Sequence, residues 1–464
     1  MPRLLVILST IGVLLSGSAA RGHIVIGTEE LDMVGHRAPF GLASGEEYTD
    51  VWGDGSFAYL GSVGSGVALM ELSAVPPEPN EPTQFSVAHL GTYAPPGHVD
   101  FQDVKVVGDT GYFSGGAGTD IVDLSNRAAP TTLARIDASN GGHAVTANVA
   151  LAGDYLYQVS NTSAIIRVFD VASPSAPTFV QNIDTADPVG LADLTFTGDR
   201  LYAAGIGGGT YVYDLSGSAT NPPPLLSTVL TGVNTSSVWT TPDGELLIAT
   251  HRELGGELEA WDISLLATPS LLQTADPSDF DFSAYSTSEV VVVESLAYVA
   301  WYQGGLEVID LDRIDTVGLE LSGYFDVGGG NPLSEFTGVR SVYPHLGPEQ
   351  VLLSNTRFGM YVVDATPAQP SAPGDYTGDG EVDLLDYDLW KQDFGTTLAA
   401  ADGNGDGAVD SADYTVWRDA MQVAAGAIAS STGVPEPTGG VFSIIGLICC
   451  AWSYRSRRSQ SKLE

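Results

Sequence analysis

The chain has 464 residues, with 18 lysines and arginines against 57 aspartates and glutamates, a net charge of −39 and a pI near 4.1. So acidic a surface opposes binding to nucleic acids and anionic lipids, because both require cationic side chains that displace counterions. The two cysteines, Cys449 and Cys450, adjoin one another near the C-terminus, which excludes disulfides and thiol chemistry from the rest of the chain. The net negative charge is better suited to binding calcium or a basic partner than to binding nucleic acids or anionic lipids.

The first twenty residues predict an export signal. Arg3 precedes the apolar run LLVILSTIGVLL, and the small residues Ser18 and Ala20 stand just before the expected cut. The run is too short for a stable membrane span, so residues 1–20 are predicted to be a secretory signal peptide that signal peptidase removes. An uncleaved N-terminal anchor is the alternative.

A similar pattern recurs seven times between Val51 and Asp364, most clearly in LAYVAWYQGGLEVIDL from Leu296 to Leu311. Two runs of alternating apolar residues flank Gly304 and Gly305, as expected for two strands joined by a tight turn. The copies recur every 44 to 54 residues with no helical segment between them, a spacing typical of propeller blades. We therefore predict a domain of seven four-stranded blades over residues 21–366. The second runs end at Glu71, Asp123, Asp170, Asp214, Asp262, Asp310 and Asp364.

Residues His23 to Gly27, HIVIG, form an additional strand-like run before the first blade. Closed propellers commonly complete one blade with strands from both ends of the domain, so we expect this run to pair in the last blade.

The blades contain no recognisable catalytic motif, so any catalytic residues are unknown. Neither a nucleophile elbow, a zinc-binding helix nor a phosphate loop is present in the sequence. We expect the isolated histidines to be hydrogen-bonded structural residues, and the aspartates that end the repeated runs to cap turns. The polar side chains considered for the channel or its loops are His98, His143, His251, His345, Arg340 and Arg357.

The blade sequences also resemble a known family. The segments DVKVVGDTGYFSGGAGTDIVDLSNRAAPTTLARI, LAYVAWYQGGLEVIDL and SVYPHLGPEQVLLSNTRFGMYVVD are similar to LVIVD-repeat propellers of exported bacterial surface proteins, some of them grouped as choice-of-anchor proteins. The resemblance covers about Val51 to Asp364. It implies an all-β propeller fold but no particular activity, because fold alone does not supply function.

A new module follows a linker with three prolines in ATPAQPSAP; we place the linker at residues 367–373 and the module at 374–423. GDYTGDGEVDLLDYDLW and ADGNGDGAVDSADYTVW repeat one another at an offset of 27 residues. Each has acidic or polar residues at positions 1, 3, 5, 9 and 12 of a loop, with glycine at position 6, the spacing of an EF-hand-type calcium loop.

The sequence thus predicts two calcium sites. Asn404 is a better ligand than its counterpart Thr377, so the second site is expected to bind more tightly. The first site comprises Asp375, Thr377, Asp379, the Glu381 carbonyl, Asp383 and Asp386; the second comprises Asp402, Asn404, Asp406, the Ala408 carbonyl, Asp410 and Asp413.

A helix is predicted only after each loop, at 384–394 and 411–423. Two such loop–helix repeats with aspartate at position 12 resemble a type I dockerin, which implies calcium-dependent folding and docking to a cohesin-like partner. The family's recognition positions fall here on Leu384–Leu385 and Ser411–Ala412, which differ from the frequent hydroxyl pairs and from each other. A calcium-stabilised spacer without a partner is the alternative.

The C-terminal tail has three parts: VPEPTGG, an apolar run over 441–454, and the arginines Arg455, Arg457 and Arg458. The run is shorter than the roughly 20 residues of a membrane span. With Pro435, Glu436 and Pro437 it resembles a PEP-CTERM sorting signal over 434–458, which implies recognition by an exosortase, cleavage and transfer to the cell surface. A plain C-terminal membrane anchor is the alternative.

Two functions follow from these features. The first is a non-enzymatic, exported interaction protein, whose propeller is a platform for an unknown ligand and whose dockerin-like module docks in calcium. The alternative is a dockerin-tethered enzyme acting on polysaccharide, a hydrolase or lyase. An enzyme of this kind needs carboxylates that face each other across the channel, whereas a channel mouth of neutral side chains would count against it.

Overall fold

The computed structural model describes residues 29–77, 82–217, 222–280, 282–312, 314, 318–327, 335–369, 374–377, 382–396, 401, 403 and 408–431. The chain divides into two compact units, Met1–Gln369 and Pro370–Glu464. Within the described residues, no helix is both long enough and apolar enough to cross a membrane. The predicted signal peptide (1–20) and sorting signal (434–458) lie outside these residues.

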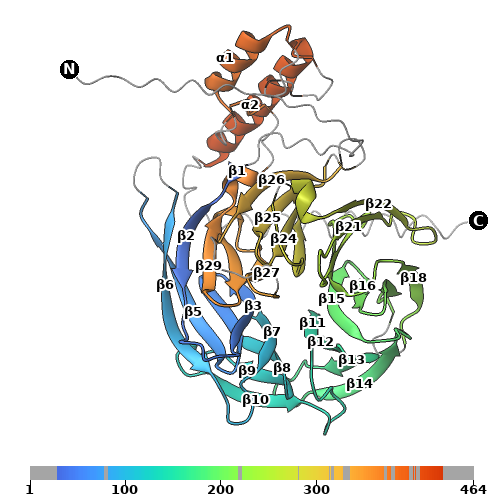
Figure 1. The fold of residues 1–464 in the computed structure, drawn as a ribbon. Coiled ribbons are helices and arrows are strands. Elements are labelled where there is room, and N and C mark those ends of the chain that lie inside the picture. The colour runs from blue at the N-terminus through green and yellow to red at the C-terminus, as the bar shows by residue number, and fades with distance from the viewer. Residues whose placement is uncertain are drawn as a thin grey trace, which may run out of the picture. The chain divides into compact units, whose positions relative to one another are not determined.

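The first unit is a seven-bladed β-propeller, as predicted, with its sheets arranged around a central channel (Figure 1). In the first five blades, neighbouring strands are antiparallel and follow one another in the sequence. Blade one is β3 (Glu47–Asp54), β4 (Phe57–Val63), β5 (Gly66–Val75) and β6 (Gln84–Tyr93). Blade two is β7 (Phe101–Val107), β8 (Thr110–Gly115), β9 (Gly118–Asp123) and β10 (Thr131–Ile136). Blade three is β11 (Asn148–Ala152), β12 (Tyr155–Ser160), β13 (Ser163–Asp170) and β14 (Thr178–Asp184).

The next two blades continue this order. Blade four is β15 (Leu191–Thr197), β16 (Arg200–Gly205), β17 (Gly209–Asp214) and β18 (Leu225–Val229). Blade five is β19 (Thr235–Thr240), β20 (Leu246–His251), β21 (Leu258–Asp262) and β22 (Ser270–Ala275). Short 3-10 helices lie at η1 (Pro277–Phe280), η2 (Pro348–Gln350) and η3 (Thr366–Ala368).

The last two blades use the N-terminal strands. Blade six is β23 (Glu289–Val293), β24 (Leu296–Trp301), β25 (Gly305–Asp310) and β26 (Glu320–Phe325), with β1 (Glu29–Glu30) parallel to β26. Blade seven is β27 (Val339–Tyr343), β28 (Val351–Asn355) and β29 (Gly359–Asp364), completed by β2 (Asp32–Arg37) antiparallel to β29. The ring is therefore closed by Asp32–Arg37; the predicted segment, His23–Gly27, lies outside the described residues.

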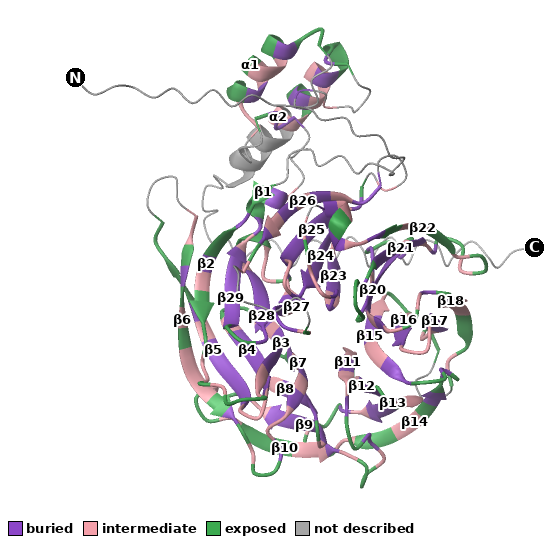
Figure 2. Cartoon of the chain, in the orientation of Figure 1, coloured by how far each residue is buried: buried purple, intermediate pink, exposed green. Residues whose placement is uncertain are grey.

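The core lies between neighbouring blades, and both faces of the middle strands are buried (Figure 2). On β24, Tyr298 packs with residues of blade seven, while Val299 packs with residues of blade five. The β24–β25 turn is the one predicted from the sequence, and Gly305 there has φ of 98°. A Cβ on Gly305 would lie 2.0 Å from the carbonyl oxygen of Phe325, so only glycine fits.

In its described residues the second unit has the helices α1 (Leu384–Asp393) and α2 (Ser411–Ser431). Both begin where the sequence predicts, although α2 continues beyond the predicted residue 423. Asp383 caps α1 by accepting a hydrogen bond from the Leu385 N–H, and Asp386 accepts one from the Asp383 N–H in return.

Candidate functional site

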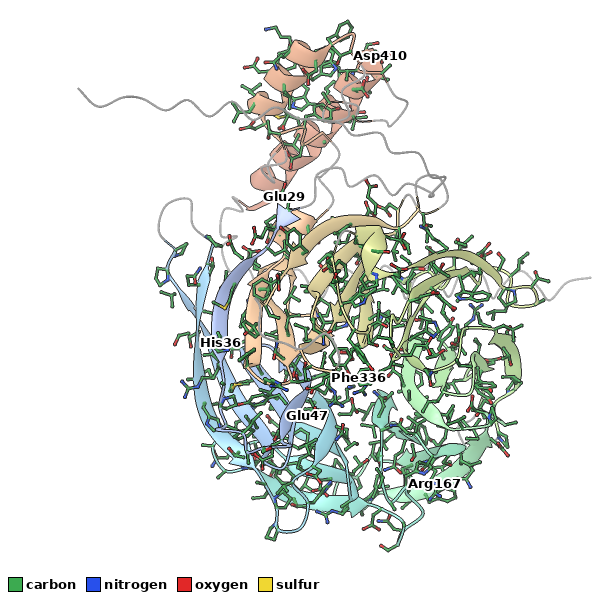
Figure 3. All side chains as sticks on the ribbon, in the orientation of Figure 1. Glu29, His36, Glu47, Arg167, Phe336 and Asp410 are labelled. Atoms are coloured by element: carbon green, nitrogen blue, oxygen red, sulfur yellow. The ribbon has the colours of Figure 1, made fainter. Side chains whose placement is uncertain are left out.

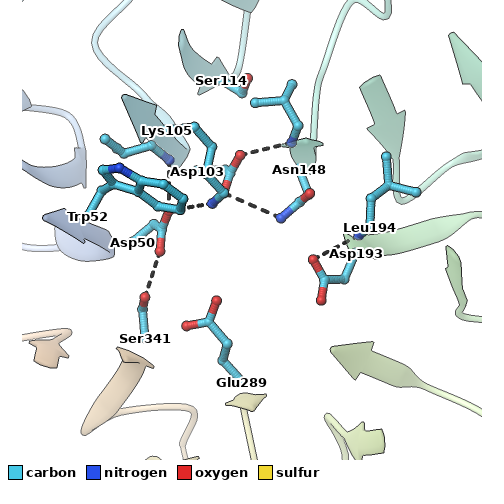
Figure 4. Close-up of polar contacts among 12 residues, drawn as sticks. Asp50, Trp52, Asp103, Lys105, Ser114, Asn148, Asp193, Leu194, Glu289 and Ser341 are labelled. Atoms are coloured by element: carbon cyan, nitrogen blue, oxygen red, sulfur yellow. Dashed lines mark hydrogen bonds and ion pairs between the residues drawn. The ribbon is translucent and has the colours of Figure 1, made fainter. Parts of the chain in front are cut away.

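Every blade places one polar side chain at the same point of its innermost strand, just before an aliphatic residue. Together they form a ring inside the channel, called the channel ring below, and Figure 4 labels all of its members except Ser237. Its members are Asp50, Asp103, Asn148, Asp193, Ser237, Glu289 and Ser341.

The channel ring links neighbouring blades by hydrogen bonds. The backbone N–H of Val104 donates to Asp50 Oδ2 of the preceding blade at 2.8 Å, and Val149 donates to Asp103 Oδ2 at 2.8 Å. The same bond recurs at four further junctions, from Val238 to Asp193, Val290 to Ser237, Val342 to Glu289 and Val51 to Ser341, at 2.9–3.4 Å. The ring side chains thus hold together sheets that share no ladder of backbone hydrogen bonds.

Lys105, the single lysine of the first unit, neutralises two members of the channel ring. Its Nζ lies 3.1 Å from Asp50 Oδ2, contacts Asp103 Oδ1, and lies over the Trp52 ring at 5.1 Å. Burial works to lower the pKa of Lys105, but the two carboxylates raise it above its ordinary value. Burial likewise works to raise the pKa of Asp50, yet Lys105 and Ser341 hold it below its usual range. Lys105 and Asp50 are therefore both charged at neutral pH.

The other two carboxyl groups of the channel ring, Asp193 and Glu289, form no ion pair among the described residues. Burial raises the pKa of both, and the nearby charge of Asp50 helps to raise that of Glu289 to about 8. Glu289 is therefore mostly protonated at neutral pH, while Asp50 is ionised.

The channel ring lines a cavity of about 620 Å³. The rest of its wall comes from neighbouring residues of the innermost strands and from loops at one end of the blades. In these loops the second strand turns to the third, or the fourth strand leads to the next blade. At the other end of the innermost strands aromatic rings pack together, with 4.7 Å between the centroids of Trp52 and Tyr343 and 5.8 Å between those of Trp239 and His345. Charged side chains as well as neutral ones line the cavity. A mouth of neutral side chains only would have counted against an enzyme, and the cavity does not have such a mouth.

The polar residues singled out in the sequence do not converge on one site. Arg340 lines the cavity, whereas Arg357 is exposed and pairs with Glu335 at 3.1 Å. The structural interpretation of the histidines is confirmed for three buried ones: their partners are Asp120 for His98, the Ile165 carbonyl for His143 and the Val233 carbonyl for His251, at 2.9–3.0 Å.

The aspartates that end the repeated runs cap turns, as predicted. Each accepts a hydrogen bond from the backbone N–H two residues later, at 2.8–3.0 Å: Asp123, Asp170, Asp214, Asp262, Asp310 and Asp364. The channel ring itself was not predicted from the sequence. Aligning the first strand of each blade would have revealed it, as a column of polar residues followed by valine or leucine.

In the first predicted calcium loop, those predicted ligands that the structure describes lie close together. Thr377 Oγ1 is 3.0 Å from Asp386 Oδ1 and 3.4 Å from Asp375 Oδ1. Asp386 is wholly buried, and the donors to it are neutral groups such as the Thr377 and Asp383 N–H. A buried carboxylate surrounded by neutral donors and further oxygens fits a hard cation such as calcium.

The second loop has the same local arrangement. Asp413, also wholly buried, accepts from the Asp410 N–H at 2.6 Å, and Asp410 accepts from the Ala412 N–H at 2.7 Å. Within the described part of the chain no group of three or more acidic, histidine or cysteine side chains could hold a metal ion. The predicted ligands outside that part are Asp379, Glu381, Asp402, Asn404 and Asp406.

Reciprocal hydrogen bonds join the two loop–helix repeats. Trp390 Nε1 donates to the Asp410 carbonyl at 2.8 Å, and Trp417 Nε1 donates to the Asp383 carbonyl at 2.7 Å. Each helix therefore anchors position 9 of the other repeat's loop, which couples the order of the two loops.

The recognition positions of the two repeats differ in chemistry. Leu384 and Leu385 are 63% and 58% exposed, an unusual state for adjacent leucines. Their counterparts Ser411 and Ala412 are also exposed but small. The recognition positions of the first repeat are therefore large and apolar, whereas those of the second repeat are small and more polar.

Family comparisons agree with both parts of the chain. Residues 373–419 match the dockerin type I domain, and residues 98–138, 141–185 and 285–311 match the LVIVD repeat. The protein is thus a seven-bladed propeller with LVIVD repeats, joined in one chain to a dockerin type I domain. No curated protein matches the chain in sequence.

Two solved structures are similar to part of this chain. The crystal structure of the computationally designed Ika8 protein has a TM-score of 0.47 and 10% identity, covering 72% of this chain and 99% of that one. Sqt1 of Chaetomium thermophilum, bound to the N-terminus of the ribosomal protein L10, has a TM-score of 0.48 and 15% identity, covering 68% and 82%. Both are too distant to bear on function.

We predict that Lys105→Met destabilises the propeller strongly, because it leaves Asp50 and Asp103 buried without a cation. Unfolding in urea should show a loss of about 3–5 kcal/mol at pH 8. The loss should be smaller at pH 5, where the carboxyl groups of the variant take up protons. Arg357→Met breaks only an exposed pair and should change stability by less than about 1 kcal/mol. Similar losses in the two variants would contradict the structural role given to Lys105.

We also predict that Asp386→Asn weakens calcium binding at the first loop, because the position 12 ligand loses its charge while the side chain keeps an oxygen. Calorimetric titration with calcium should show the affinity of one site falling by at least about tenfold. Asp388→Asn alters an exposed aspartate of the same helix and should leave the titration unchanged. An unchanged titration for Asp386→Asn would show that Asp386 is not a ligand.

Proposed function

We propose that this protein is exported to the cell surface, where its propeller is a non-enzymatic binding platform and its dockerin domain docks in calcium to a cohesin-like partner. The observation that carries the proposal is the pair of acidic loops whose described ligands, Asp375, Thr377 and Asp386, lie close together within a dockerin match. Two calcium ions, one for each loop, would satisfy the buried Asp386 and Asp413.

The proposed route to the surface rests on the two ends of the sequence. Residues 1–20 would be removed by signal peptidase, and Pro435, Glu436 and Pro437 would mark a PEP-CTERM signal that an exosortase cleaves. Such processing would place the protein with the choice-of-anchor group of surface proteins.

The first repeat is the better docking surface. Exposed Leu384 and Leu385 offer apolar area that becomes buried on binding, whereas Ser411 and Ala412 offer little. The cohesin-like partner is therefore expected to present an apolar patch rather than a surface selective for hydroxyl pairs.

We predict that the purified protein captures its partner from the native cell envelope in calcium and loses it in chelator. Leu384→Ser with Leu385→Ser should weaken capture at least about tenfold, since most of the apolar contact is lost. Ser411→Ala, at the equivalent position of the second repeat, serves as the control. Equal capture in chelator would contradict calcium-dependent docking. No capture, with calcium still folding the domain, would make it a structural spacer.

A second candidate function is polysaccharide cleavage in the propeller cavity. It is favoured by the coexistence of a carboxyl group mostly protonated at neutral pH, Glu289, with an ionised one, Asp50, in one cavity. Glycoside hydrolysis uses an acid and a base of this kind.

If the cavity is catalytic, incubation with a panel of polysaccharides should release new reducing ends or unsaturated products. Glu289→Gln should then lower the rate by about a hundredfold or more, because it removes the acidic proton and still accepts the Val342 N–H. Absence of products from every polysaccharide, or an unaffected rate in Glu289→Gln, would contradict the catalytic candidate.

A further inference from the structure

The loops around the open end of the cavity carry exposed aliphatic side chains, called the rim below. The rim residues lie in loops that connect the second strand of a blade to the third, or the fourth strand to the next blade. Both kinds of loop lie at the same end of the propeller, because successive strands run in opposite directions. Leu230 and Leu254 are each 75% exposed. The rim comprises Val145, Val189, Leu230, Val233 and Leu254.

The deeper wall of the cavity is acidic. Asp193 and Glu289 have no cationic partner among the described residues, and Asp100 also lines the cavity. The two arginines of the wall do not neutralise them: Arg340 Nη1 pairs with Glu47 at 2.7 Å, and its Nη2 bonds Gln102. A bound cation would therefore pair with Asp193 and would favour the ionised form of Glu289.

Arg252 is the remaining cationic side chain in the cavity wall. It is exposed and lies over the rings of Phe336 and Tyr302, at 5.0 and 5.7 Å. Phe336 and Glu47 both lie on the inner side of the ring of blades (Figure 3). Because its guanidinium stacks on these rings instead of pairing with the channel-ring carboxylates, Arg252 leaves Asp193 and Glu289 available.

The cavity also contains hydrogen-bonding groups that have no partner. Thr146 is wholly buried and lines the cavity, yet its Oγ1 has no hydrogen bond within the part of the chain that the structure describes. Asn148 Oδ1 is likewise unpartnered, although its Nδ2 donates to Asp103 at 3.3 Å. Both atoms are covered by neighbouring protein atoms, so the polar groups of the wall that a ligand can reach include the partly exposed carboxyl groups of Asp193 and Glu289.

A single metal ion does not fit this arrangement. Within the described residues no three acidic, histidine or cysteine side chains are close enough to hold one. The volume of about 620 Å³ is that of a cavity for an organic ligand. An ammonium or guanidinium on a flexible stem carries three to five N–H donors and can contact several separated acceptors at once.

We propose that the cavity binds a lysine or arginine side chain of a partner polypeptide, whose neighbouring apolar residues pack on the rim. The proposal rests on the propeller being a binding platform. It names a polypeptide rather than a free polyamine, because a polyamine would leave the aliphatic rim exposed. The chain's net charge of −39 would attract such a cationic segment from a distance.

The proposal can be tested by selecting binders to the purified protein from a displayed library of random twelve-residue peptides. Recovered peptides should share one lysine or arginine flanked by apolar residues. A synthetic copy of a recovered peptide should lose at least about tenfold in affinity when that residue is replaced by norleucine. Spermidine, used as the free-polyamine probe, should bind much more weakly than the peptide.

Protein variants locate the site. Asp193→Asn with Glu289→Gln, and separately Leu230→Ser with Leu254→Ser, should each weaken the peptide by at least about tenfold. Asp199→Asn, in an exposed turn at the opposite end of the blades, should leave the affinity for the peptide unchanged. The rim variant alters only exposed side chains, so it remains informative if the charge variant fails to fold.

Recovered peptides without a cation, equal binding to the variants, or spermidine binding as tightly as the peptide would overturn the inference. In the first two cases the propeller would remain a binding platform for a different ligand. Recovery of no peptide would overturn both the inference and a platform for polypeptides. Calcium-dependent docking of the dockerin domain is measured separately, so its failure would be distinguishable from all of these results.

Discussion

The propeller depends on hydrogen bonds between blades that share no backbone ladder. Packing of aliphatic side chains holds the sheets face to face, but it does not fix their register along the channel. The bonds from Val104 to Asp50 and from Val51 to Ser341 do so, because each joins the innermost strand of one blade to a side chain of its neighbour. Repeating this bond around the ring brings several carboxyl groups into one narrow space.

That structural solution also creates the chemistry of the cavity. Lys105 forms ion pairs with Asp50 and Asp103, which lie next to it, but with neither Asp193 nor Glu289 among the described residues. The uncompensated acidic groups face a cavity that opens toward an apolar rim. Both candidate uses of the propeller, cation recognition and glycan chemistry, therefore depend on side chains whose first role is to join the blades.

The dockerin domain shows a different coupling. Its two loops are joined through the tryptophans of the helices, since Trp390 and Trp417 each bond the loop of the other repeat. Calcium in one loop would then help to order the other, because both ends of each bond must be in place. The exposed Leu384 and Leu385 show that equivalent positions can keep this framework while their binding chemistry diverges.

The sequence by itself determined the features that depend on short-range patterns. Alternating apolar residues gave the blades and the β24–β25 hairpin, the terminal aspartates gave the turn caps, and the loop spacing gave the proposed calcium ligands and the start of each helix. All of these depend on residues a few positions apart. Tertiary structure alone decided the channel ring, ring closure by Asp32–Arg37 and the crossed tryptophan bonds. Trp390 and Asp410 are 20 positions apart, whereas Asp32 and its partner Asp364 are 332 positions apart. Such residues become neighbours only when the chain is folded.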